Sequence, residues 1–288
     1  MPKRVSASQI IIMAIVGLIA VLCLAPMIMV LMTSFATERD ITMNGYSFWP
    51  RQWSAEAYKR LINPISRVPR SYWTTIQATL IGTFFAVLMS YGAGYSLSCP
   101  QCKYRNGIAL YFFITMIFSA GLVPWYMINR LLGLRDNIWA LIVPSLMFSP
   151  FNMYLVRNFV RDIPESLRES GLIDGAGEAR IAFQIYFPLA LPVLATITLF
   201  YAIAYWNNYF NAVMLVDDVN LYPLQMLLFN IQSELQMINN MMAGMSITPP
   251  KESFKMAASI ITIGPIILIY PLLQRYFVKG MVVGAVKG

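Results

Sequence analysis

Long uncharged stretches dominate the pattern of hydrophobic and polar positions along this chain. Six of them have about the 20 residues that a helix needs to cross the hydrocarbon core of a bilayer. Every Lys, Arg, Asp and Glu lies outside these stretches. Because backbone polar groups in lipid must be satisfied within the segment, such runs predict membrane-spanning helices. The six predicted spans are residues 10–35, 71–98, 108–129, 138–156, 188–216 and 256–274.

The composition supports a membrane protein. Of the 288 residues, 58% are hydrophobic and only 12% are charged, whereas soluble domains carry about 25% charged residues. Histidine is absent, which excludes His-based triads, His-ligated metals and His proton relays. The net charge of +8 suits anionic lipid headgroups, and no Lys/Arg-rich run indicates nucleic-acid binding. The sequence therefore predicts an all-α membrane protein that forms a single transmembrane domain over residues 1–288.

The orientation follows from the flanking charges. The first stretch is too long for a signal peptide and lacks a convincing cleavage site, so we expect a retained span with a cytoplasmic N-terminus. Once the long segment 36–70 is discounted, the Lys/Arg bias favours both termini in the cytoplasm. Segments 36–70 and 217–255 would then face outward. The basic residues of the first outer segment could pair with an acidic protein, neutralise lipid headgroups or attract an anionic glycan; they are Arg39, Arg51, Lys59, Arg60, Arg67 and Arg70.

Two short helices separated by a glycine are predicted in the cytoplasmic segment 157–187. Asp162 is placed as an N-cap, with Glu165 three residues later as in a capping box and Pro164 in the first turn. Asp174-Gly175 is a turn pair, after which a second helix leads toward the fifth span, whose start Pro188 sets. Ile163, Leu167 and Leu172 give the first helix a partial apolar face. Periodicity alone leaves two interpretations open: an interfacial hairpin without a partner, or a docking element.

The residues of this segment resemble the EAA loop of ABC importer permeases, in which a Glu, a Gly, an Ile and a Pro recur at fixed spacing. Glu169, Gly175, Ile185 and Pro188 reproduce that spacing. The sequence departs from the pattern at Ser170 and Gly171, where alanines usually stand, and glycine should loosen the first helix. The stretches LAPMIMVLMTSF, LFYAIAYWNNYFNAVM and QRYFVKGMVVGAVKG are similar to carbohydrate-importer permeases as well.

The resemblance implies a permease subunit that translocates a carbohydrate, most like importers of oligosaccharides and polyuronates such as alginate. It implies a multi-pass protein of the bacterial cytoplasmic membrane that works with a second homologous permease, two ATPase subunits and an extracytoplasmic solute-binding protein. The sequence has no phosphate-binding loop, so ATP and Mg would bind to the partner ATPase and this chain would carry no cofactor, metal or catalytic residue. The ATPase-coupling residues carried over are Glu169, Asp174, Gly175, Ala176, Ile185 and Pro188.

The fifth predicted span combines aromatic rings with amide side chains, which suits a sugar whose faces are apolar and whose rim carries hydroxyls. An interfacial aromatic belt with helix–helix amide contacts is the alternative. The candidate substrate-path residues are Tyr201, Tyr205, Trp206, Asn207, Asn208 and Asn211.

Among other functions, an ion-coupled secondary transporter is the main rival, but it usually needs ionisable groups inside the membrane. The pair Cys99 and Cys102 has no nearby partner ligands for a zinc site.

Overall fold

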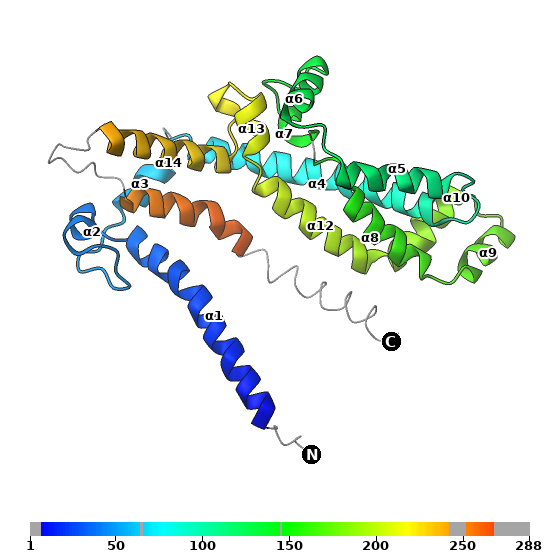
Figure 1. Cartoon of the computed structure of the whole chain (residues 1–288), viewed down its shortest axis with the longest axis horizontal. Helices are drawn as coiled ribbons and strands as arrows, with labels where there is room; N and C mark the ends of the chain where they lie inside the picture. Colours follow the sequence, from blue (N-terminus) through cyan, green and yellow to red (C-terminus); the bar gives the residue numbers. More distant parts are fainter. Residues whose placement is uncertain (1–6, 64–65, 145, 242–251, 268–288) are drawn as a thin grey trace. The chain divides into compact units, whose positions relative to one another are not determined.

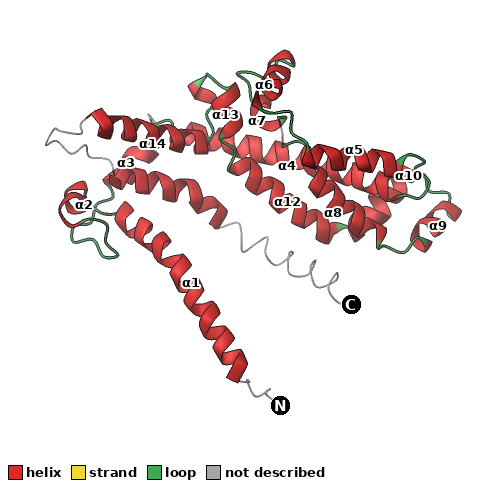
Figure 2. Cartoon of the chain, viewed as in Figure 1, coloured by secondary structure: helices red, strands yellow, loops and turns green. Residues whose placement is uncertain are grey.

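The computed structural model describes residues 7–63, 66–144, 146–241 and 252–267. Helices dominate these residues, and their β-structure is limited to one isolated bridge between Ala36 and Trp53 (Figures 1 and 2). The predicted all-α class is confirmed. The described residues divide into two compact units, one within 1–68 and 228–264 and the other within 69–227 and 265–288.

The first unit contains α1 (Ala7–Ser34), α2 (Glu38–Asn44), α3 (Glu56–Ile62), most of α14 (Leu224–Met241) and most of a helix over residues 252–267. The large apolar side chains of α1 between Ile10 and Leu24 are each more than half exposed. A helix with such an apolar surface on all sides is stable in lipid rather than in water. Burial begins in its last turn, where Ser34 shares a 2.6 Å hydrogen bond with the hydroxyl of Tyr58.

Carboxylates organise the segment that follows α1. Asp40 accepts hydrogen bonds from the side chain of Asn44 (2.7 Å) and from the backbone N–H groups of Arg51 and Gln52. These hydrogen bonds, that of Asn44 first, hold the pKa of Asp40 below its usual value. Glu38 accepts the backbone N–H groups of Glu252 (2.8 Å) and Ser253 (3.1 Å) and so satisfies donors at the start of the helix over residues 252–267.

The second unit is built around α4 (Val68–Ser98). Small residues recur every four positions along this helix, at Gly82, Ala86, Ser90 and Gly94. A Cβ atom added to Gly82 would overlap the ring of Tyr205, and one added to Gly94 would lie 2.8 Å from the side chain of Val156. The small residues therefore permit close helix contacts. The other elements of this unit are α5 (Arg105–Ile117), α6 (Leu122–Leu131), α7 (Trp139–Ile142), α8 (Pro150–Arg161), α9 (Ser166–Ile173), α10 (Glu178–Arg180), the π-helix η1 (Ile181–Tyr186), α11 (Phe187–Leu189), α12 (Leu191–Trp206), α13 (Phe210–Leu215) and the short 3₁₀-helix η2 (Val219–Leu221).

Two described helices are long and apolar enough to cross a membrane by themselves, Ser8–Ser34 and Val68–Ser98. They agree with the predicted spans 10–35 and 71–98. Two bent pairs meet the same criterion if each pair counts as one span: α5 with α6, bent by 117°, and the helix Glu178–Leu189 with α12, bent by 81°. By length and composition, the described residues thus hold up to four spans rather than the six predicted.

The structure does not form a single unbroken helix over the predicted spans 108–129, 138–156 and 188–216, because lack of charge does not ensure an unbroken helix. The first run breaks before Gly121, which has a φ of +86°. The second breaks between α7 and α8, where Pro144 and Pro150 lack the N–H that a helix interior needs. The third is interrupted at residues 207–209. The predicted span 256–274 coincides with helix up to residue 267; residues 268–274 and the family-like tail to 288 lie outside the described residues.

Candidate functional site

The segment between α8 and α12 contains the two short helices that the sequence predicted, but the first has different bounds. Asp162 is the C-cap of α8, and α9 begins at Ser166 without a side-chain capping bond. The predicted capping box at Asp162 and Glu165 was therefore wrong. Because α8 continues to Arg161, Asp162 ends the preceding helix instead of starting the next one.

The predicted turn at Gly175 is confirmed. Gly175 has a φ of +77°, its N–H donates to the carbonyl of Leu172 (3.0 Å), and the N–H of Ala176 donates to the carbonyl of Gly171 (2.9 Å). This pair of bonds is the Schellman arrangement that ends a helix with a left-handed residue, for which glycine carries no Cβ penalty. The sharp turn places α10 directly after α9.

Gly171 owes its identity to a close helix contact. A Cβ atom at this position would lie 3.0 Å from Cδ1 of Ile185 and 3.3 Å from Cγ1 of Ile181, both on η1. An alanine would force these isoleucines to move by a few tenths of an ångström. The departure from the family pattern at Gly171 thus brings α9 close to η1, and the half-buried Ile185 is one of the contacts.

The outer surface of α9 is apolar and exposed. The side chain of Ile173 is 86% exposed, and those of Leu167 and Leu172 are also exposed. Glu169 and Asp174 are exposed on the same short helix and its cap. Three exposed aliphatic side chains thus lie beside two carboxylates on the surface of α9 and its cap.

An ion pair that the sequence analysis missed joins the two short helices. Arg168 on α9 contacts Glu178, the first residue of α10, and the Arg168 side chain is only 6% exposed. The Tyr95 hydroxyl of α4 donates to the other oxygen of Glu178 at 3.3 Å. The only signal of this ion pair in the sequence is that residues of opposite charge lie on either side of the Asp174-Gly175 turn.

The sequence predicted that Pro188 starts the fifth span, but in the structure no helix begins at Pro188. It lies in a helix that runs from Glu178 to Leu189, and the bend into α12 occurs at Ala190. Proline cannot donate the helical hydrogen bond, and the π-helical stretch just before it is one of the local adjustments that let a helix continue past such a residue.

The aromatic and amide side chains of the fifth predicted span bond to the chain itself. The Tyr205 hydroxyl donates to the carbonyl of Ile142 (2.9 Å), and the Asn211 amide donates to that of Pro144 (2.9 Å). The Asn208 amide donates to the carbonyl of Leu141 (3.3 Å), while the Tyr201 hydroxyl accepts the N–H of Ser149 (2.9 Å). These side chains thereby satisfy backbone groups in and beside the break between α7 and α8.

The remaining candidates of that span lie in two different environments. Trp206 is buried, with its ring 6.4 Å from that of Tyr72. Asn207 is exposed and accepts a hydrogen bond from the side chain of Gln225 (3.0 Å). A role in the substrate path stays a prediction, and Asn207 is the candidate amide with the most accessible side chain.

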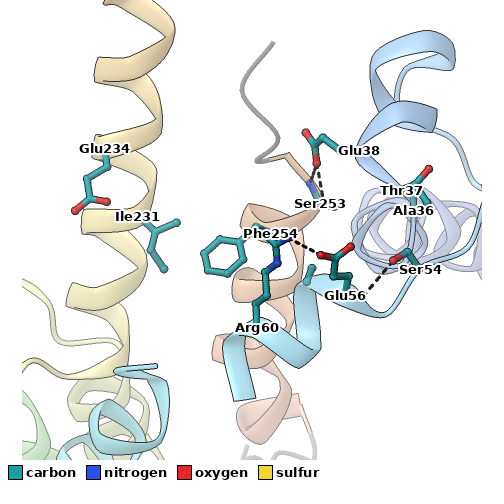
Figure 3. A pocket seen from close by; sticks show the side chains of 11 residues that line it. Ala36, Thr37, Glu38, Ser54, Glu56, Arg60, Ile231, Glu234, Ser253 and Phe254 are labelled. Carbon is teal, nitrogen blue, oxygen red and sulfur yellow. Dashed lines mark hydrogen bonds and ion pairs between the residues drawn. The ribbon is translucent and has the colours of Figure 1, made fainter. Parts of the chain in front are cut away.

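A separate cavity of about 330 Å³ lies in the first unit. Figure 3 shows Glu38 directed at Ser253 and Glu56 paired with Arg60 in its wall. Arg60 was one of the basic residues considered for attracting an anionic partner. Its pairing with Glu56 neutralises part of that charge. The whole lining is Ala36, Thr37, Glu38, Ser54, Glu56, Ala57, Arg60, Ile231, Glu234, Ser253 and Phe254.

Comparison with known proteins places these features in a family. Residues 106–283 match the family described as "Binding-protein-dependent transport system inner membrane component". The chain is 36% identical over 271 residues to the polygalacturonan/rhamnogalacturonan transport system permease protein YtcP of Bacillus subtilis (strain 168), covering 93% of this chain and 94% of that protein. It is 35% identical over 274 residues to protein LplC of the same organism, covering 94% and 92%.

A solved structure agrees with these relatives. The fold matches a chain in the crystal structure of a bacterial ABC transporter involved in the import of the acidic polysaccharide alginate, with a TM-score of 0.83, 31% identity, and coverage of 94% of this chain and 98% of that one. The resemblance seen in the sequence is confirmed, and the ion-coupled alternative gains no support. ATP hydrolysis occurs on a separate subunit, and this chain belongs to the binding-protein-dependent transport system inner membrane components, as the permease of an ABC transporter.

Proposed function

We propose that this chain is one of two homologous permease subunits of a bacterial importer for oligosaccharides derived from acidic polysaccharides. An extracytoplasmic binding protein delivers the substrate, and two ATPase subunits, which bind ATP and Mg, drive its transport. The acidic substrate class is supported by two likenesses, one to a polygalacturonan/rhamnogalacturonan permease and one to an alginate importer. Polygalacturonan, rhamnogalacturonan and alginate all contain uronate residues, which carry carboxylates.

In this proposal the chain crosses the membrane six times, with both termini in the cytoplasm. α7 and α8 together form one crossing whose backbone is interrupted. Non-helical backbone at membrane depth is tolerated where protein groups satisfy it, and Tyr205 and Asn211 supply such groups here. α1, α4, the bent pair of α5 with α6, α12 and the helix over residues 252–267 complete the set of crossings.

Residues 162–187 form the coupling loop, which docks on the ATPase from the cytoplasmic side. The observation that carries this assignment is the exposed apolar surface of α9, above all Ile173 at 86% exposure, on a short helix with a sharp glycine turn. Glu169 and Asp174 add negative charge for basic groups of the ATPase. Ala176, Ile185 and Pro188 shape the second helix, which leads directly into α12.

The fifth crossing has two roles in this proposal. Its buried hydroxyl and amide groups hold the interrupted crossing, while Asn207, with Trp206 beside it, faces the substrate path. Sugar contacts are shared with the second permease, so a single substitution here affects substrate affinity more than the maximal rate.

Reconstituted complex in proteoliposomes, supplied with binding protein and ATP, tests the proposed function. We expect uptake of galacturonate or guluronate/mannuronate oligosaccharides and stimulation of ATP hydrolysis by the loaded binding protein. Neutral oligosaccharides of equal length serve as the matched substrates. Uptake that prefers the neutral sugars would reject the acidic substrate class, and uptake that continues without ATP would reject the ATPase-driven mechanism.

A further inference from the structure

The ion pair between Arg168 and Glu178 crosses the turn at Gly175. Arg168 projects from α9 and is 6% exposed, whereas Glu178 at the start of α10 is 54% exposed. One oxygen of the Glu178 carboxylate accepts a hydrogen bond from the Arg168 guanidinium, and the other accepts a hydrogen bond from the Tyr95 hydroxyl. A single carboxylate thus joins three elements: α9, α10 and α4.

The surroundings of Arg168 make this carboxylate its main counter-charge. A cavity of about 60 Å³ beside it is lined by Cys99 and Tyr186 among others, and the Nε atom of Arg168 has no hydrogen-bond partner in the part of the chain that the structure describes. Burial lowers the pKa of Arg168, but the hydrogen bond and charge of Glu178 raise it overall, so the guanidinium stays charged. With Glu178 54% exposed, the pair is only partly buried, and such a pair is weak evidence for stability.

Packing on both sides continues the connection that the ion pair begins. Tyr95 stacks edge-on against Tyr186 of η1, with ring centroids 5.4 Å apart. Gly171 of α9 lies against Ile185 of the same π-helix. Along the chain, the turn at Gly175 connects α9 to α10. The ion pair and these packing contacts give α9 further attachments, through which a force on α9 reaches α4 and the helix that precedes α12.

We propose that Arg168 and Glu178 are positioning residues for energy coupling: together with the Tyr95 hydroxyl they form a clasp that fixes α9 to α4 and α10. The proposal rests on the role of this loop as the ATPase-docking element. When the ATPase moves α9, the clasp makes α4 and the helix from Glu178 to Leu189 move with it as one body. Rigid-body displacement of packed helices is a common way to transmit such a motion.

The decisive variant is Glu178→Gln, which keeps the shape of the side chain and removes its charge. We expect the substrate transported per ATP hydrolysed to fall about tenfold, while the complex still copurifies with its ATPase. Glu234→Gln, the same change at an exposed carboxylate outside the coupling loop, is the matched control and should leave this ratio unchanged. A wild-type ratio in Glu178→Gln would overturn the proposal.

Graded variants separate positioning from simple stabilisation. Tyr95→Phe removes one hydrogen bond and should lower the same ratio about threefold. Arg168→Lys keeps the charge and should retain more coupling than Arg168→Met. A pair that only stabilised the fold would reduce the amount of assembled complex and leave transport per ATP intact, which would also contradict the clasp. If Arg168→Met fails to assemble, the result with Glu178→Gln decides.

The variant Gly175→Leu, assayed in parallel, distinguishes this proposal from the one on which it rests. Loss of coupling in Gly175→Leu with normal coupling in Glu178→Gln would contradict the clasp and leave the proposed role of the docking loop intact. Normal coupling in Gly175→Leu would contradict the proposed coupling role of the whole loop.

Discussion

Two regions are rich in residues that suggest function: the polar span around α12 and α13, and the short-helix segment around α9. Their side chains point to different partners. In the polar span, Tyr205 and Asn211 bond to backbone carbonyls of the chain itself. In the segment around α9, the turn and the ion pair are internal, while Ile173 and Glu169 remain exposed. The first arrangement supports the fold of the permease, and the second presents a surface. Substitutions in the two regions should therefore change different measured quantities.

Gly175→Leu should have the largest effect. A leucine forced to a φ of +77° carries backbone strain of about 1–3 kcal/mol, and we expect uptake to fall by up to about a hundredfold while the complex still assembles. Gly177→Ala is the matched control, because Gly177 has a φ of −71° and open space around its Cα. Uptake and ATP hydrolysis in proteoliposomes measure the effect. Wild-type uptake by Gly175→Leu would contradict the role of the turn.

Asn211→Leu should produce the opposite phenotype, a loss of stability without uncoupling. The Asn211 side chain is buried, and its removal leaves the carbonyl of Pro144 without this donor, which should lower the free energy of unfolding by about 2 kcal/mol. The exposed Asn207→Ala should change it by less than about 0.5 kcal/mol. Thermal unfolding of the purified complex compares the two. Equal stability of the two variants would mean that the amide bond does not hold the interrupted crossing.

Local signals made part of this structure predictable. An uncharged run without an internal break is sufficient to recognise α1 and α4, and Asp-Gly is sufficient to recognise the turn at Gly175. Asp162 was predicted as the N-cap of a new helix, but aspartate can also stand at the end of a helix. Only the length of α8 shows that Asp162 ends α8. The helix α14 lies in a segment treated as a loop, although Leu224, Leu228 and Ile231 recur at helical spacing.

The missed features depend on contacts between distant residues. Hydropathy reports where the chain is apolar, and it cannot show that the backbone between α7 and α8 leaves the helix and is satisfied by side chains from α12 and α13. The family pattern likewise gave Glu169 and Gly175, but the pairing of Arg168 with Glu178 depends on how α9 packs on η1. The sequence thus indicates the function of each region more readily than the role of each residue within it.

Ile173→Ser sharpens the comparison from the side of the exposed surface. Burying an isoleucine in an interface contributes about 1.5 kcal/mol or more, so the affinity for the ATPase should fall about tenfold. Because Ile173 is 86% exposed, the stability of the permease itself should stay unchanged. Titration of detergent-solubilised permease pair with purified ATPase measures the affinity. Unaltered binding would place the docking surface elsewhere on the chain.

Tyr205→Phe should have the smallest effect and gives the most stringent comparison of the two regions. The substitution keeps the ring against Gly82 and removes only the hydroxyl that donates to the carbonyl of Ile142. We expect the free energy of unfolding to fall by about 1 kcal/mol, with transport per ATP unchanged. Thermal unfolding and the substrate affinity of uptake are measured on the same preparation. If affinity for the oligosaccharide falls while stability does not, the hydroxyl contacts substrate, and the division between a self-satisfied span and an exposed docking helix no longer holds at this residue.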